Sequence, residues 1–391
     1  MQGVPMIRTG LEVFLDKSEE YRGRRIALIA NQTCVTSDLE YGWDALRKRG
    51  ISLVRIFTPE HGLFATEQDQ KAVHRQPGPD VDLVSLYGDS YDTLLPDPKC
   101  IEDIDMVIFD IQDVGARYYT YVNTMALFMK RLQDTDIEFV VLDRPNPLGG
   151  MGIEGPLLQE GFESFVGILP VAVRHGMTPG ELALLYRDGC SLRISPAVMK
   201  MEGWKREMRY RETGLPWVPP SPNMPTEDTA CRYPGFCLIE GTSLSEGRGT
   251  TMPFSVIGAP SVNPDELASR LNGFGLAGVY FRPVYFKPTF HKYADTTVAG
   301  VFVHITDLQA FHSFQAGVAL VKTVFDLYGD EMLFLTGVYE FNDRHPAFDL
   351  LAGSSLIREM IVGGSSLDEI FESWRDDEKR FMKTKEKYHL Y

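Results

Sequence analysis

The feature that most constrains the fold is a series of short apolar runs, each ending in polar, turn-forming residues. These runs occupy residues 25–30, 51–57, 105–110 and 138–143, and segments with helical patterns lie between them, such as 39–48 and 119–132. Short β-branched runs that alternate with helical segments are typical of βαβ units, whose strands form one parallel sheet. We therefore predict an α/β fold for the first half of the chain.

The second half predicts a further α/β domain. The segment 217–225 is rich in proline and cannot form regular helix or a central strand, so we interpret it as a stiff connection between domains or as a wall of the cleft between them. A chain of 391 residues is long enough for two domains. The predicted domains are residues 1–225 and 226–391. Beyond the proline-rich segment, helical patterns and strands are expected at 264–271, 278–281, 300–306, 310–328 and 367–387.

Charge and hydropathy argue against several partners. The 54 acidic residues outnumber the 39 Lys and Arg residues, giving a net charge of −15 that disfavours nucleic acid and anionic lipid. No apolar stretch is long enough to span a membrane, so no membrane insertion is expected. The five cysteines are scattered, and the N-terminus lacks the pattern of a signal peptide. As written, the chain is expected in the cytoplasm, or outside it if a leader has been removed.

The polar residues at the strand ends are the first candidates for a functional site. Carboxyl ends of parallel strands share one edge of a sheet, and ligands bind in the crevice there. We therefore expect several acids, two arginines and a histidine to lie close together. The candidates at these strand ends are Glu60, His61, Asp110, Asp113, Arg117, Tyr119, Asp143, Arg144 and Asn146.

Two further segments carry candidate residues. Arg174 and His175 precede a predicted helix start, where Thr178 and Glu181 have the spacing of a capping box and an anion would meet the helix N-terminus. The segment 240–251 is rich in glycine and hydroxyl residues, and glycine lets a backbone approach a polar ligand closely. The candidates in this loop are Glu240, Glu246 and Arg248.

Structural interpretations compete with these functional ones. Asp143 and Arg144 could form an internal ion pair that holds the following Pro-Asn-Pro turn, and Asp110 could cap a turn. His61 could make a structural hydrogen bond to a neighbouring carboxylate. The tyrosines that follow Arg117 could stack on a sugar or pack in the core.

Four motifs together resemble the exo-β-N-acetylmuramidase family, also known as the NamZ-like or DUF1343 family. The motifs are Thr58-Pro-Glu-His-Gly-Leu-Phe64, Phe109-Asp-Ile-Gln-Asp-Val-Gly-Ala-Arg-Tyr-Tyr-Thr-Tyr121, Leu142-Asp-Arg-Pro-Asn-Pro147 and Glu240-Gly-Thr-Ser-Leu-Ser-Glu-Gly-Arg-Gly-Thr250. The resemblance implies a Rossmann-like N-terminal domain and a smaller C-terminal α/β domain, with the active site in the cleft between them. It also implies hydrolytic release of a terminal β-1,4-linked N-acetylmuramic acid from the non-reducing end of peptidoglycan fragments.

The resemblance makes Glu60 the leading catalytic acid, with His61 orienting it or contacting the sugar. Asp110, Asp113, Glu240 and Glu246 remain open as base, nucleophile or brace for the acetamido group, because retaining, inverting and acetamido-assisted routes all fit the sequence. This chemistry requires no metal or organic cofactor. The residues expected to bind substrate are Arg117, Tyr119, Arg144, Asn146, Arg174, His175, Glu240 and Arg248.

Muramic acid carries a lactyl carboxylate, so a selective cleft needs a fixed cation, and arginine is the strongest choice. We expect Arg174 to serve this role ahead of Arg117 and Arg248, because a helix start follows Arg174.

Two other functions stay open at the level of sequence. Asp110, Asp113 and Asp143 could hold a divalent metal in a hydrolase or transferase. The same cleft could also bind muramyl sugars without turnover.

Overall fold

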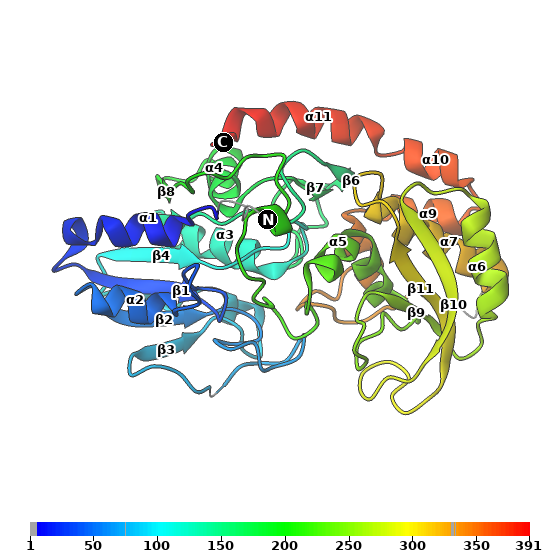
Figure 1. Cartoon of the computed structure of the whole chain (residues 1–391), viewed down its shortest axis with the longest axis horizontal. Coiled ribbons are helices and arrows are strands. Elements are labelled where there is room, and N and C mark those ends of the chain that lie inside the picture. Colours follow the sequence, from blue (N-terminus) through cyan, green and yellow to red (C-terminus); the bar gives the residue numbers. More distant parts are fainter. Residues whose placement is uncertain (1–5, 75, 330–331, 333) are drawn as a thin grey trace.

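The computed structural model describes residues 6–391 except 75, 330, 331 and 333. Two α/β units lie side by side, each built around its own sheet (Figure 1). The first unit runs from α1 to β8 (residues 10–199), and the second unit runs from α5 to α10 (residues 227–372). Within the described residues, no helix is long and apolar enough to cross a membrane.

The first unit contains a parallel six-stranded sheet with the order β3-β2-β1-β4-β5-β8. The chain leaves β1 toward β2 and later returns to β4 on the other side, so a crevice forms at the carboxyl ends of these strands. This confirms the predicted Rossmann-like α/β fold. The strands are β1 (Arg25–Ala30), β2 (Ser52–Thr58), β3 (Asp82–Ser85), β4 (Met106–Asp110), β5 (Glu138–Leu142) and β8 (Ala197–Met199).

Alternating side chains of the central strands pack against different helix layers. Ile26 and Leu28 of β1 belong to the core beneath α1 and α2, whereas Ala27 and Ile29 belong to the core shared with α3 and α4. Burial on both faces explains why β1 is a continuous apolar run. The helices of this unit are α1 (Gly10–Asp16), α2 (Gly42–Lys48), α3 (Thr120–Leu132) and α4 (Pro179–Gly189).

The predicted capping box at the start of α4 is present. The Thr178 hydroxyl accepts a hydrogen bond from the Glu181 amide at 3.3 Å, and the Glu181 carboxylate accepts one from the Thr178 amide at 3.1 Å. Local sequence therefore sets this helix start. A small antiparallel pair, β6 (Glu154–Leu157) and β7 (Ala172–Arg174), precedes the helix and was not expected from the sequence.

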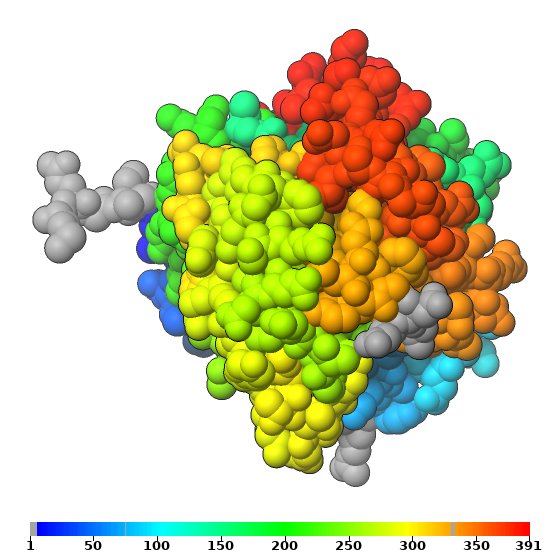
Figure 2. All heavy atoms as spheres, turned by 90° about the vertical axis from the view of Figure 1, so that its right-hand side faces the viewer, coloured from blue at the N-terminus to red at the C-terminus, as the bar shows by residue number. Residues whose placement is uncertain are grey.

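The second unit contains an antiparallel three-stranded sheet with the order β10-β11-β9, covered by helices. Figure 2 views this unit end-on, with the yellow-green surface of α6 across the middle of the face. Its elements are α5 (Glu227–Phe236), β9 (Val256–Ala259), α6 (Pro264–Gly273), β10 (Val279–Phe286), β11 (Val298–Ile305), α7 (Ser313–Tyr328), α8 (Ala347–Ala352), α9 (Leu356–Val362) and α10 (Leu367–Glu372).

The C-terminal helix ties the two units together. The helical pattern at 367–387 is interrupted before Arg375, and α11 (Arg375–Lys385) runs along the top of Figure 1 back to the first unit. The Lys385 ammonium donates a hydrogen bond to the carbonyl of Gly150 at 2.6 Å, and the Glu378 carboxylate accepts one from the amide of Gly155 at 2.8 Å. Burial raises the pKa of Glu378 to about 7 and lowers that of Lys385 to about 8.

The proline-rich segment serves both roles considered for it. It leads into α5, and the carbonyl of Pro220 accepts hydrogen bonds from Asn31 at 3.2 Å and from the Tyr121 hydroxyl at 2.6 Å. These contacts hold the segment over the carboxyl end of β1. Ser221 and Asn223 then line a pocket between the units.

Candidate active site

A pocket lies where loops of both units meet. It encloses about 470 Å³ of space not filled by atoms, part of it open to solvent. Because segments distant in sequence converge here from both units, the site depends on how the two units are joined. The pocket is lined by Glu60, His61, Asp69, Tyr118, Tyr119, Thr120, Tyr121, Val166, Ser221, Asn223, Met224, Tyr233, Glu240, Arg248, Phe254, Tyr339 and Glu340.

Glu60 follows β2 and is almost fully buried, with 4% of its surface exposed. One carboxylate oxygen accepts a hydrogen bond from the hydroxyl of Thr120, the first residue of α3, at 2.7 Å. The other oxygen accepts a hydrogen bond from the backbone N–H of Gln70 at 3.3 Å. The two contacts fix the carboxyl in the pocket, and no ion pair of Glu60 occurs within the described part of the chain.

His61 makes the turn that places this loop. Its backbone lies in the left-handed region, with φ of 70°, and Gly62 follows with φ of 82°. The His61 Nδ1 lies 2.8 Å from the carbonyl oxygen of Glu67. Because a carbonyl only accepts, Nδ1 carries a hydrogen. The expected structural hydrogen bond is therefore made to a backbone carbonyl, while the imidazole also lines the pocket.

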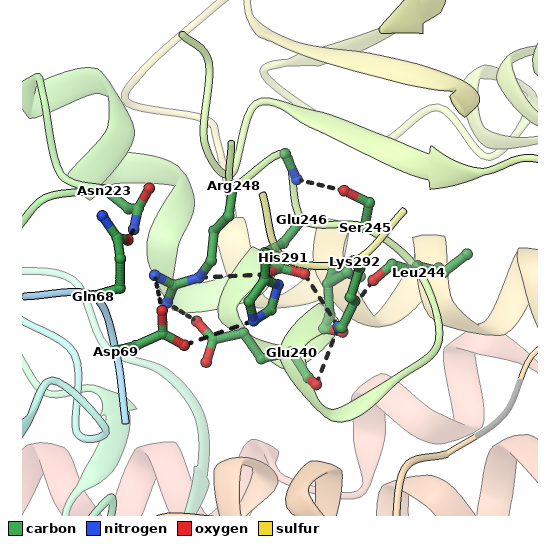
Figure 3. Close-up of polar contacts among 12 residues, drawn as sticks. Gln68, Asp69, Asn223, Glu240, Leu244, Ser245, Glu246, Arg248, His291 and Lys292 are labelled. Carbon is green, nitrogen blue, oxygen red and sulfur yellow. Dashed lines mark hydrogen bonds and ion pairs between the residues drawn. The ribbon is translucent and has the colours of Figure 1, made fainter. Parts of the chain in front are cut away.

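A cluster of charged residues forms one wall of the pocket and joins the two units (Figure 3). Arg248 lies at its centre, with Nη1 3.1 Å from Asp69, Nη2 2.7 Å from Glu240 and Nε 3.3 Å from Glu246. Asp69 comes from the loop after β2, whereas the other three come from the glycine-rich loop of the second unit. This ion-pair network therefore spans the interface.

Two cations complete the cluster behind Arg248. Lys292 Nζ lies 3.1 Å from Glu246, and His291 Nδ1 lies 3.0 Å from the same carboxylate. Burial opposes charge on Glu246, but Lys292, His291 and Arg248 outweigh it and lower its pKa to about 2. The hydrogen bond to Glu246 raises the pKa of His291. Glu246 is thus an ionised structural anchor, and it does not line the pocket.

Aromatic rings form the opposite wall. The Tyr119 ring packs edge-on against Tyr121, at 4.9 Å between centroids, and against Tyr233, at 5.6 Å. All three line the pocket and are buried. The packing interpretation of the tyrosine run therefore holds, and stacking of these rings on a sugar stays a prediction.

Asp110 and Arg144 form a buried ion pair that does not line the pocket. Arg144 Nη2 donates to Asp110 at 3.0 Å, its Nε also contacts this carboxylate, and Cys34 Sγ donates at 3.0 Å. The catalytic role expected for Asp110 and the substrate-binding role expected for Arg144 stay predictions, because the structure shows only that neither residue lines this pocket. Their charges satisfy each other at the end of β4.

Asp113 and His175 also lie away from the pocket. The Asp113 carboxylate accepts a hydrogen bond from the Gly115 amide at 2.6 Å and lies 3.6 Å from His175 Nε2. The Asn146 side chain donates to the Met177 carbonyl at 3.0 Å, which holds the turn after β5. The three residues do not line the pocket, and the roles expected for them in catalysis or binding stay predictions.

Arg117 and Arg174 are engaged by the protein itself. Arg117, 1% exposed, donates to the carbonyls of Pro156, Val171 and Leu351 at 2.8–2.9 Å. Arg174 Nη1 lies 2.6 Å from the Glu154 carboxylate, across the β6–β7 pair. Neither side chain lines the pocket, and the expectation that Arg174 binds the lactyl carboxylate stays a prediction. Of the three candidate arginines, Arg248 alone lines the pocket.

The three acids considered for a metal are held in separate interactions. Asp143 accepts hydrogen bonds from the Gly180 amide at 2.8 Å and from the hydroxyls of Thr178 and Tyr391 at 2.7 Å. Within the described ranges, no group of three or more His, Cys, Asp or Glu residues could hold a metal ion. The geometry therefore gives no support to a site built from Asp110, Asp113 and Asp143.

Sequence reasoning missed five acidic or aromatic residues that line the pocket. They are Asp69, Tyr233, Phe254, Tyr339 and Glu340. Asp69 follows Glu60 by nine positions on the same loop. Tyr339 and Glu340 belong to a run of aromatic and polar residues before α8, and that run was the available signal. The Tyr339 hydroxyl donates to Glu240 at 2.8 Å, which joins this loop to the charged wall.

Comparisons with known proteins identify the family of the chain. The family models described as exo-beta-N-acetylmuramidase NamZ, N-terminal and C-terminal, match residues 26–228 and 231–391. The peptidoglycan beta-N-acetylmuramidase NamZ of Bacillus subtilis (strain 168) is 42% identical over 392 residues, which cover 99% of this chain and 92% of that protein.

Two solved structures share the fold along nearly the whole chain. Both are DUF1343 family proteins from Bacteroides fragilis NCTC 9343, with TM-scores of 0.88 and 0.75 and identities of 36% and 30%. Each match covers 98% of this chain and 99% of the other.

Proposed function

This chain belongs to the NamZ family of exo-β-N-acetylmuramidases, and on that premise we propose that it removes terminal β-1,4-linked N-acetylmuramic acid from the non-reducing end of peptidoglycan fragments. As a member of this family it is a glycosidase. The activity named for the Bacillus subtilis relative, a peptidoglycan beta-N-acetylmuramidase, supports peptidoglycan as the substrate class. A pocket walled by loops of both units suits the binding of a single terminal sugar.

The observation that carries the proposal is the placement of Glu60. Its carboxyl is buried in the pocket, held by Thr120 and Gln70, and faces other acids and the tyrosine wall. A general acid must reach the glycosidic oxygen of a bound sugar, and the Glu60 carboxyl lines the pocket without an ion-pair partner among the described residues. Glu60 is therefore our candidate for the acid, and His61 beside it is our candidate for a contact to the sugar.

The proposed reaction consumes one water molecule for each bond cleaved. As the bond between C1 and the glycosidic oxygen breaks, its electron pair stays on the oxygen, which takes the proton of Glu60. The hydroxyl of water then bonds to C1, and the remaining proton of water restores the carboxyl. Retaining, inverting and acetamido-assisted routes differ in the group that stabilises C1 between these events.

The decisive assay follows chromophore release from a β-muramyl glycoside, run beside the glucosaminyl analogue. We expect the protein to cleave the muramyl substrate faster. Glu60→Gln should lower turnover by roughly 10²–10⁴-fold, the usual contribution of a general acid, and should leave sugar binding intact. Glu160→Gln is the matched control, because Glu160 is exposed and does not line the pocket.

Two results would count against the proposal. Wild-type protein that binds muramyl sugars without releasing chromophore would indicate a binding protein. Full turnover in Glu60→Gln would remove Glu60 from the acid role.

A further inference from the structure

A second cavity lies between the two units, apart from the candidate active site. It encloses about 870 Å³ of space not filled by atoms, part of it open to solvent. Its walls come from the segment leading into β6, from Arg174 of β7, from the connection after β8 and from the segment before α7. It shares no lining residue with the candidate active site. A ligand bound here would therefore contact both units without filling the pocket around Glu60.

The lining of this cavity is positively charged. Three arginines line it, namely Arg174, Arg206 and Arg209, whereas its acids among the described residues are Glu154 and Glu207. This excess is local, because the whole chain carries a net charge of −15. A cavity with more fixed cations than anions favours an anionic ligand.

The acids near the cavity do not neutralise all three arginines. One oxygen of Glu154 lies 2.6 Å from Arg174 Nη1, and the other accepts a hydrogen bond from the Phe314 amide at the start of α7, at 2.9 Å. Arg206 contacts the carboxylate of Glu181, which lies outside the lining. The Nε atoms of Arg174 and Arg206 are buried without a hydrogen bond in the described part of the chain.

Arg209 is the arginine of the three that has no ion pair among the described residues. Its Nη2 donates to the carbonyl of Leu308 at 2.7 Å, and its Nε and Nη1 make no hydrogen bond within the described ranges. Burial lowers the pKa of Arg209, and the nearby charge of Arg174 lowers it further. An anion in the cavity would offset this repulsion and accept the unused N–H groups of Arg209.

Glycines keep the wall of the cavity close to two of the guanidinium groups. A Cβ atom on Gly152 would lie 2.6 Å from Arg174 Cζ, and one on Gly150 would lie 2.7 Å from Arg206 Nη1. Side chains at these positions would displace the arginines, so glycine holds both cations in place. Cations that are fixed before a ligand arrives lower the entropic cost of binding it.

The second unit contributes neutral polar groups. Gln309 and His312 line the cavity and are exposed, and neither side chain makes a hydrogen bond to another described residue. An amide and an imidazole can both donate to an oxygen atom. Polar groups of both units therefore converge on one cavity, as in sites that bind small molecules.

We propose that this cavity binds a small molecule with a doubly charged oxyanion group, either a phosphate or a pair of carboxylates, and that Arg209 is its main contact. Guanidinium groups match the geometry of both kinds of oxyanion and bind them through charge-assisted hydrogen bonds. The site is separate from the pocket around Glu60, so the inference does not depend on the proposed function.

The test follows the melting temperature of the full chain as inorganic phosphate or, separately, malonate is added, with ionic strength held constant by sodium chloride. A ligand that binds only the folded protein raises the melting temperature with its concentration. We expect this rise with at least one of the two probes, and isothermal titration then gives its Kd. The probe with the lower Kd identifies the oxyanion group that the site prefers.

Two variants of the lining should change the Kd in opposite directions. Arg209→Gln should raise it roughly tenfold or more, because a charge-assisted hydrogen bond is lost. Glu207→Gln removes an exposed acid from the same lining and should lower it. Arg270→Gln on the exposed face of α6 is the matched control and should leave the Kd unchanged. Melting temperatures without added anion measure what the Leu308 contact contributes to stability in Arg209→Gln.

The inference is overturned if neither probe binds saturably at constant ionic strength. It is also overturned if Arg209→Gln binds as tightly as wild-type protein, because the anion then lies elsewhere. The proposed function fails separately: anion binding at Arg209 without chromophore release would refute the glycosidase activity alone, and chromophore release without anion binding would refute this site alone.

Discussion

Two groups of buried charges in this protein look alike in sequence and differ in structure. Asp110 and Arg144 at the strand ends of the first unit pair with each other and are fully buried within that unit. The cluster around Arg248 draws Asp69 from one unit and Glu240 from the other, and it borders a pocket. The position of a charge at the carboxyl edge of a sheet therefore does not by itself mark a functional site.

The difference lies in what remains unpaired. Asp110 has a cation of its own, so its burial is compensated and no ligand is needed. Beside the Arg248 cluster, Glu60 and Glu340 have no ion pair among the described residues, and both face the cavity. The candidate active site is distinguished by buried carboxyls in a cavity that lack an ion-pair partner, and not by the number of charges at that place.

Removing the charge of Asp110 should have the largest effect on stability. Asp110→Asn leaves Arg144 buried without its counter-charge, which should lower the free energy of unfolding by about 3–5 kcal/mol in urea denaturation. Asp105→Asn is the matched control, because its pair with Arg25 at the opposite end of β4 is exposed to solvent and its loss should cost much less. Loss of turnover with unchanged stability in Asp110→Asn would place Asp110 in the chemistry after all.

Much of the fold of the first unit follows from local patterns. β1 occupies the residues expected from its apolar run, and the start of α4 follows from its capping box. β3 and β8 escaped prediction because they are short edge strands with half-exposed side chains and lack a continuous apolar run. Local patterning indicates strands that are buried on both faces and says little about edges.

The site could be predicted only in part. Glu60, His61 and Tyr119 lie in motifs near strand ends, and the structure brings them together at the pocket. The ion pair between Arg174 and Glu154 could not be predicted from the sequence. Glu154 lies on β6, which pairs with β7 in an antiparallel arrangement that no local pattern indicated. Glu340 was missed because it lies 280 positions after Glu60 and reaches the same pocket only through the docking of the two units.

Because of the Arg248 cluster, the free energy of unfolding should decrease at acidic pH. The pKa of Glu246 is about 2 in the folded protein, below its usual value near 4.5, so its charge stabilises the fold above about pH 4.5. This contribution, about 3 kcal/mol, is lost as pH falls toward 2. Glu246→Gln should therefore show a flatter decline of unfolding free energy between pH 4.5 and 2 than wild-type protein. Parallel declines would mean that the cluster does not stabilise the charge of Glu246.

A lysine at position 248 should separate recognition from structure. Arg248→Lys keeps a positive charge near Asp69 and Glu240 but loses the planar fork that binds a carboxylate through two hydrogen bonds. If Arg248 binds the lactyl carboxylate, kcat/KM should fall about tenfold more for the muramyl than for the glucosaminyl glycoside. Equal losses would mean that Arg248 only organises the neighbouring acids. Arg270→Gln on the exposed face of α6 is the control.

The smallest expected effect is a change in the free energy of unfolding near neutral pH that depends on His291 in the Arg248 cluster. The hydrogen bond from His291 to Glu246 raises the pKa of His291, so its stabilising contribution is complete below about pH 6.5 and is lost as pH rises through the higher folded value. Because His291 is about one third exposed, the effect should stay below about 1 kcal/mol.

The measurement compares unfolding free energies from pH 6 to 9 for wild-type protein and His291→Gln, with His74→Gln as the exposed control. Wild-type protein should lose stability with rising pH, and the His291 variant should lose less. If the unfolding free energy falls equally with pH in both proteins, the hydrogen bond to Glu246 does not make the charge of His291 stabilising. Asp69, 3.9 Å from His291, would then be held to the second unit by Arg248 alone among the described ion pairs.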